Sequence, residues 1–93
     1  MNVVFIGLGR MGFLQARLAR YFGDTILAGI DIDTLADSTF AAKFMCATYD
    51  CLDDAADALA NADLVWITAT DSEIEAVAKN LSGWVNGNTV VLH

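Results

Sequence analysis

Residues 3–12 read VVFIGLGRMG, an apolar run that leads directly into a G-x-G-x-x-G motif. The motif alone is weak, because glycine is a common residue. Here an amphipathic stretch starts near Met11, a second apolar run covers residues 26–30, and Asp31 follows about 20 residues after the motif. Strand, glycine turn, helix, strand and acid in this order are what a dinucleotide-binding βαβ unit requires. We therefore predict a dinucleotide site; the alternative is a glycine-rich turn without a ligand.

Each glycine of the motif has a predicted role. Gly7 permits the tight turn, Gly9 lets the backbone approach the pyrophosphate, and Gly12 lets the helix pack close to the strand. The N–H groups and the positive end of the helix dipole then face the phosphates. Arg10 either reaches a phosphate, stacks on the adenine, or is a solvated loop charge.

The rest of the chain continues the alternation of strands and helices. We predict strands at residues 2–6, 25–30, 44–48, 63–68 and 89–92. Helices are predicted at 11–22, from a cap at Asp33 to about Lys43, around 52–59, and after a capping box at 70–73. The first helix is expected to bury one apolar face and to turn Arg17 and Arg20 outward. That face consists of Leu14, Leu18 and Tyr21 or Phe22.

This alternation implies parallel strands joined by right-handed crossovers. The predicted fold class is α/β, a Rossmann doubly wound parallel sheet of about five strands in the order 3-2-1-4-5, without the usual sixth strand. An apolar share of 56% suits strands that are buried on both faces. Residues 1–93 are expected to form one dinucleotide-binding domain.

Ligands of such sheets bind at the carboxyl ends of the strands, where the strand order reverses. We expect Asp31 to accept hydrogen bonds from the adenosine ribose; the alternative is a helix cap or a loop acid. Asp31 and Asp33 would repel a 2′-phosphate, and no basic residue follows strand two before Lys43, which favours NAD over NADP. The predicted cofactor-binding residues are Gly7, Leu8, Gly9, Arg10, Met11, Gly12, Asp31, Ile32, Asp33, Thr68, Ala69 and Thr70.

The sequence offers a cofactor site but no clear reaction centre. His93, at the end of strand five, is the one candidate for proton transfer. No metal site is expected, because Cys46 and Cys51 form no C-x-x-C pair and there is a single histidine. The acids Asp53, Asp54 and Asp57 are interpreted as a solvated helix face.

The composition also argues against some classes of binding partner. A net charge of −7 with only five basic residues argues against a nucleic-acid surface. No apolar run approaches the roughly 18 residues of a membrane span, and the start does not resemble a signal peptide. Two reduced thiols suit a cytoplasmic protein. The uncovered edge of strand five favours a homodimer or contact with another domain.

The residues 5–12, FIGLGRMG, resemble the opening of β-hydroxyacid dehydrogenases in the 6-phosphogluconate dehydrogenase-like superfamily. The run 68–74 followed by 90–93, VVLH, is similar to Rossmann-like oxidoreductases of that superfamily, with Thr70 where they typically have proline. The opening also resembles the Gfo/Idh/MocA oxidoreductases, although their pattern after strand four is missing. The resemblance implies an NAD(P)-binding domain whose active site is completed by a following helical domain, absent from this chain.

Two functions follow as hypotheses. The first is the cofactor-binding part of an NAD(P)-dependent oxidoreductase, which positions the nicotinamide for hydride transfer and is inactive alone. The second is a non-catalytic NAD(H)-binding sensor or regulatory module. Fold alone does not decide between them.

Overall fold

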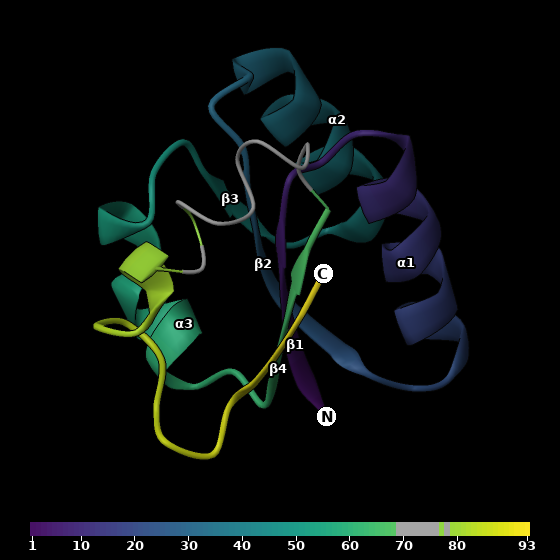
Figure 1. Ribbon diagram of the computed structural model, residues 1–93. Helices are drawn as coiled ribbons and strands as arrows, with labels where there is room; N and C mark the ends of the chain where they lie inside the picture. Colours follow the sequence, from purple (N-terminus) through teal and green to yellow (C-terminus); the bar gives the residue numbers. More distant parts are fainter. Residues whose placement is uncertain (69–76, 78) are drawn as a thin grey trace.

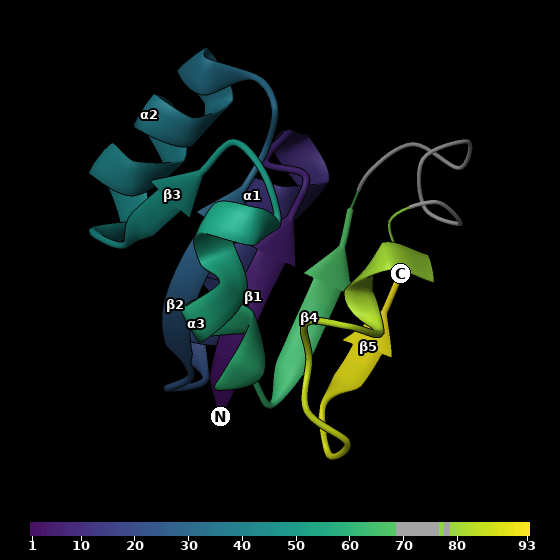
Figure 2. The same cartoon turned by 90° about the vertical axis from the view of Figure 1, so that its left-hand side faces the viewer.

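The computed structural model describes residues 1–68, 77 and 79–93, and its centre is a five-stranded sheet in the order β3-β2-β1-β4-β5. All four strand pairs are parallel. This is the predicted Rossmann-like α/β architecture, and Figure 2 shows the strands side by side. The described elements are β1 (Asn2–Ile6), α1 (Arg10–Tyr21), β2 (Thr25–Ile30), α2 (Thr34–Phe44), β3 (Ala47–Tyr49), η1 (Asp53–Ala55), α3 (Ala56–Ala60), β4 (Leu64–Ile67) and β5 (Val90–Leu92).

The central strand β1 is buried on both faces, which explains why its sequence is apolar without alternation. Val3 and Phe5 pack against α1 and α2, whereas Val4 and Ile6 pack in a second cluster with α3. The helices accordingly lie in two layers, with α1 and α2 on one side of the sheet and α3 on the other (Figure 1).

The buried face of α1 differs from the prediction. The helix buries Gly12, Ala16 and Ala19, and its large apolar side chains other than Phe13 point outward. Small residues let the helix axis approach the sheet closely, and Phe13 fills the space towards α2 by stacking edge-on against Phe40. The residues wrongly expected on the buried face are Leu14, Leu18 and one of Tyr21 and Phe22; all four are between 44% and 83% exposed. Arg17 and Arg20 are exposed, as predicted.

The second helix begins as predicted and ends at Phe44, one residue into the strand that was expected next. The Asp33 carboxylate accepts hydrogen bonds from the backbone N–H groups of Leu35 and Ala36 and so caps α2. Phe44 belongs to α2 rather than to a strand, because its ring is needed in the aromatic cluster with Phe40. Met45 then takes the left-handed conformation, with φ of 54°, and ends the helix. The third strand therefore starts at Ala47 and not at residue 44.

The remaining predictions on the fold hold where the structure describes the chain. The acids Asp53, Asp54 and Asp57 are exposed on η1 and α3, while Leu59 is buried. The predicted capping box at 70–73 lies outside the described residues. No helix in the described part of the chain combines the length and apolarity needed to cross a membrane.

Candidate dinucleotide site

The loop between β1 and α1 has the geometry that the glycine motif predicts. Gly7 has a φ of +89°, which glycine adopts without strain, and its N–H donates to the carbonyl oxygen of Ile30 at 2.8 Å. A Cβ atom at Gly12 would lie 2.3 Å from the Gly7 carbonyl oxygen. The chain therefore turns at Gly7, and α1 packs directly against this turn at Gly12.

Thr68, directly after β4, holds the turn from the other side. Its hydroxyl donates to the Gly7 carbonyl oxygen at 2.5 Å and lies 3.3 Å from the carbonyl oxygen of Ile6. Its backbone N–H donates to the carbonyl oxygen of Ile6 at 2.8 Å. Since β1 and β4 are the strands between which the order reverses, Thr68 joins the two halves of the site at the switch point.

The carboxylate of Asp31 is hydrogen-bonded to the glycine loop and to the loop that follows β2. One carboxylate oxygen accepts the backbone N–H of Leu8 at 2.8 Å, and the other accepts the N–H of Asp33 at 2.9 Å. Two such bonds leave acceptor capacity on both oxygens, because a carboxylate offers about four lone-pair positions. The structure thus rules out the helix cap for Asp31 and places it in the loop, while its carboxylate retains acceptors for hydroxyl groups. The helix cap is Asp33.

The neighbouring site residues divide into buried and open ones. The side chain of Leu8 is only 2% exposed, so only its backbone faces the loop. Ile32 is 84% exposed, and Met11 is 55% exposed. Gly9 begins α1 in an ordinary extended conformation, and a Cβ atom there would meet nothing within 4 Å. The protein itself therefore does not require glycine at position 9, whereas a group lying on the loop would.

Arg10 lines a groove of about 520 Å³ between α1 and α2. Arg17 and Lys43 line the same groove, together with Asp33 and apolar side chains such as Leu14. The chain has only five basic residues, so this groove gathers most of its positive charge. Arg10 is the first residue of α1 and directly follows the glycine loop.

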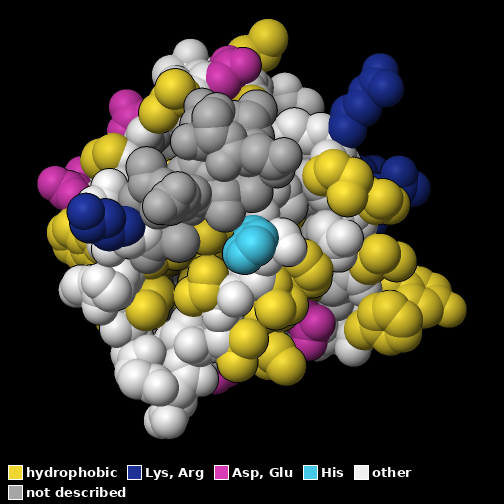
Figure 3. Space-filling model, viewed as in Figure 1, with side chains coloured by type: hydrophobic (Ala, Val, Ile, Leu, Met, Phe, Trp, Pro, Cys, Tyr) yellow, Lys and Arg dark blue, Asp and Glu magenta, His cyan; other side chains and the backbone are white. Residues whose placement is uncertain are grey.

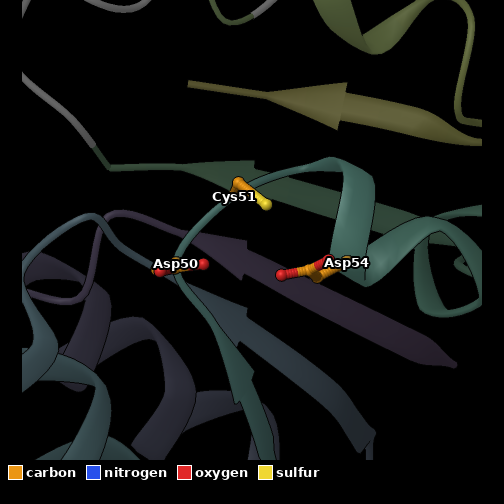
Figure 4. Close-up of side chains that lie close together, drawn as sticks. All are labelled: Asp50, Cys51 and Asp54. Carbon is orange, nitrogen blue, oxygen red and sulfur yellow. The ribbon is translucent and has the colours of Figure 1, made fainter.

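The other predicted site residues are less informative. His93 is exposed at the end of β5. Ala69 and Thr70 lie outside the described residues. Cys46 and Cys51 are both free thiols. Figure 4 shows Cys51 beside Asp50 and Asp54, whose ligand atoms lie within 4.8 Å of one another, but all three side chains are exposed. Exposed acids of this kind are common without a metal, and the cluster lacks the buried geometry of a metal centre.

The sequence reasoning missed Asp37, in the first turn of α2. Its side chain is 8% exposed, and its Oδ1 atom has no hydrogen-bond partner. Burial, together with the carboxylate of Asp31, raises the pKa of Asp37; a backbone hydrogen bond from Asp31 lowers it, and Asp50 and Asp33 raise it further. Spacing was the available signal, because Asp37, Phe40 and Phe44 share the i, i+3, i+7 stripe that α2 buries.

No protein-family model matches the sequence, and no curated protein matches it. Several solved structures share its fold. A prephenate dehydrogenase from A. aeolicus, solved with hydroxyphenyl propionate and NAD⁺, superimposes with a TM-score of 0.88 at 22% identity, over 98% of this chain and 32% of its own. A scyllo-inositol dehydrogenase from Lactobacillus casei with NAD(H) and scyllo-inositol gives a TM-score of 0.67 at 18% identity, over 98% and 26% of the two chains.

An oxidoreductase from Desulfitobacterium hafniense that is assigned as NADPH-dependent gives a TM-score of 0.82 at 16% identity, over 99% of this chain and 26% of its own. These structures include NAD- and NADPH-linked proteins, so the fold does not distinguish the two cofactors. The chain spans about a third of the length of the solved structures or less. It has the Rossmann fold found in these dehydrogenases, and its glycine loop, Asp31 and Thr68 meet at the switch point of the sheet.

Proposed function

We propose that this chain is the cofactor-binding part of an NAD(P)-dependent oxidoreductase. One observation carries the proposal: the glycine loop is held by hydrogen bonds from both flanks, yet no atom of the described residues lies within 4 Å of where a Cβ atom at Gly9 would be. Thr68 binds the loop at Gly7, and Asp31 binds it at Leu8. The dinucleotide pyrophosphate fits there because the backbone can approach it and the first N–H groups of α1 have no partner within the helix.

The residues of the chain would then act as follows. The loop from Gly7 to Gly12 binds the pyrophosphate, and Asp31 accepts hydrogen bonds from the ribose hydroxyls. Arg10 lies near enough to the loop to pair with a phosphate. A bound nicotinamide cofactor supplies hydride chemistry. The resemblance to the 6-phosphogluconate dehydrogenase-like superfamily supports this role, and the free thiols support a cytoplasmic location.

We favour NAD as the cofactor. Asp31 and Asp33 are the acids at the ribose end, and Asp31 is held in place by two backbone hydrogen bonds, so it cannot easily turn away from a 2′-phosphate. Calorimetric titration with NAD⁺, NADH, NADP⁺ and NADPH tests both the site and the choice. Binding of none of the four would contradict the proposed function, whereas a preference for NADPH would contradict only the cofactor assignment.

The site assignment has a sharper test in Gly9. The change Gly9→Val adds a branched side chain where the pyrophosphate must lie, although the free protein has room for it. We expect dinucleotide affinity to fall at least about tenfold, or about 1.4 kcal/mol, while the far-UV circular dichroism stays that of the parent. Unchanged NADH affinity in fluorescence titration would remove the pyrophosphate from this loop.

A non-catalytic NAD(H) sensor is the second candidate function. It is favoured by the lack of an acid–base pair at the site among the described residues, where His93 is the one group suited to proton transfer. An assay of NADH oxidation in the presence of a substrate-binding domain distinguishes the two candidate functions, because the sensor binds NADH without oxidising it.

We also propose that the chain associates with itself. The outer edge of β5 has no neighbouring strand among the described residues, and Val90 is 53% exposed. Hydrophobic side chains gather from this edge across to α1 on the face drawn in Figure 3. A hollow of about 220 Å³ lies between α1 and β4, lined in part by Leu18, Phe22 and Trp66. Apolar surface of this kind marks contact sites in soluble proteins.

A further inference from the structure

Asp37 is the one charged side chain buried within the described part of the chain. It lies one turn after Asp33 in α2, and the backbone N–H of Asp37 donates to the Asp33 carbonyl oxygen at 3.0 Å. Its Oδ1 atom is sealed from solvent and lacks a hydrogen-bond partner. A buried carboxylate in this state is costly, so its presence calls for a physical reason.

The charged groups that act on the Asp37 carboxylate are acids. The structure gives three that act on its charge: Asp31 at the end of β2, Asp33 in the following loop, and Asp50 after β3. The N–H of Asp31, which donates to the Tyr49 carbonyl oxygen at 3.0 Å, also interacts with the Asp37 carboxylate. The N–H of Asp31 compensates in part for the charge of Asp37, and so does the positive end of the α2 dipole, because Asp37 is in the first turn.

These four acids lie at the carboxyl ends of β2 and β3, which is the ribose end of the proposed cofactor site. The Oδ1 atom of Asp37 is inaccessible to a ligand there, because it is covered by protein. Asp37 can still act through its electric field, which is weakly screened at a buried position.

We propose that Asp37 is a second, buried determinant of cofactor choice: its carboxylate, held behind Asp31, disfavours a phosphate on the 2′ position of the adenosine ribose. The inference rests on the proposed function, and it adds a residue that acts through its charge. A 2′-phosphate carries up to two negative charges, whereas the hydroxyl of NADH is neutral at the same place. Loss of the Asp37 charge therefore affects NADPH much more than NADH.

The test is the ratio of the dissociation constants of NADPH and NADH, measured by fluorescence titration of the chain. In Asp37→Asn, which keeps the side-chain shape, we expect affinity for NADPH relative to NADH to rise about fivefold to tenfold. The matched control is Asp57→Asn, which removes the same charge from the exposed face of α3. The ratio in this control should stay that of the parent.

A pH series separates the field of Asp37 from a merely structural effect. As the pH falls, protonation of Asp37 removes its charge, so the parent should approach the ratio of Asp37→Asn. The phosphate itself loses one of its two charges near pH 6, and this alone reduces the effect of Asp37. The further closing of the gap between parent and variant below that pH is the part that protonation of Asp37 causes.

Three results would overturn the inference: an unchanged ratio in Asp37→Asn, an equal change in Asp57→Asn, or a difference from the parent that does not depend on pH. If Asp37→Asn does not fold, Asp37→Ser provides a second neutral variant. Failure of both to fold would itself contradict the premise that the carboxylate is held at a cost. If the parent binds neither NADH nor NADPH, the proposed function fails instead, and the two failures are thereby distinguished.

Discussion

Replacing Gly12 with alanine should destabilise the protein, although alanine is the better helix former. A Cβ atom at position 12 would lie 2.3 Å from the Gly7 carbonyl oxygen and 3.1 Å from Thr68 Oγ1. Ordinary contact starts at 3.4 Å, so α1 or the loop must move by about 1 Å. The Gly7 carbonyl cannot move freely, because it accepts the Thr68 hydroxyl.

The size of the loss follows from three terms. Overpacking costs about 1–3 kcal/mol, and the Thr68–Gly7 hydrogen bond that must stretch is worth about 1 kcal/mol. Better helix propensity offsets about 1 kcal/mol. The net loss is therefore about 2 kcal/mol, which corresponds to a fall in Tm of roughly 8–16 °C for a domain of this size.

Thermal and urea unfolding followed by circular dichroism measure this loss, and Gly9→Ala is the matched control. The same methyl group at position 9 meets nothing within 4 Å, and the backbone there is in a region open to any residue. We expect Gly9→Ala to stay within about 1 kcal/mol of the parent, since the N-cap preference for glycine over alanine is small. Equal stability of the two variants would refute the close packing of α1 on the loop.

Four further outcomes are expected. Combining Asp31→Ser with Ile32→Arg removes a repelling charge and adds a guanidinium for the 2′-phosphate. The double variant should therefore bind NADPH better than NADH. If titration shows that it still prefers NADH, the proposed role of Asp31 is contradicted. Asp37 has a raised pKa in the folded protein, so its contribution to stability is fully present at low pH and is lost as the pH rises through that pKa. Asp37→Asn should consequently unfold at higher urea than the parent at neutral pH, and the gap should close in acid; a gap that persists in acid would exclude the charge as its cause. The chain by itself should not change the nicotinamide absorbance when it is incubated with NAD(H) and a panel of hydroxy acids and imines, because hydride transfer also needs an oriented substrate. Turnover that survives repurification would show that the chain is a complete enzyme. Light scattering after size exclusion at about 10–100 μM should give the mass of a dimer, and a mass near 10.0 kDa would indicate a protected β5 edge.

The chain order of local elements could be read from the sequence because each depends on neighbours in the chain. The run before Gly7 is apolar without alternation, which indicates a strand buried on both faces, and the Asp33 cap begins α2 where expected. The strand order 3-2-1-4-5 followed as well, since parallel strands with right-handed crossovers leave few arrangements. The turn at Gly7 has the positive φ that the motif demands.

Packing of the helices against the sheet decided which side chains are buried and where α2 ends. The apolar stripe of α1 predicted a buried face with Leu14 and Leu18, yet Ala16 and Ala19 face the sheet. Periodicity reports where apolar residues lie on a helix, but not which face the sheet approaches, and here the close approach at Gly12 selects the small residues. In the same way, Phe40 and Phe44 pack together and keep residue 44 in α2, and Asp37 is buried on the same helix. The burial of Asp37, and the effect of the carboxylates of Asp31 and Asp50 on it, arise only when β2, β3 and α2 pack together. The order of residues along the chain does not reveal them.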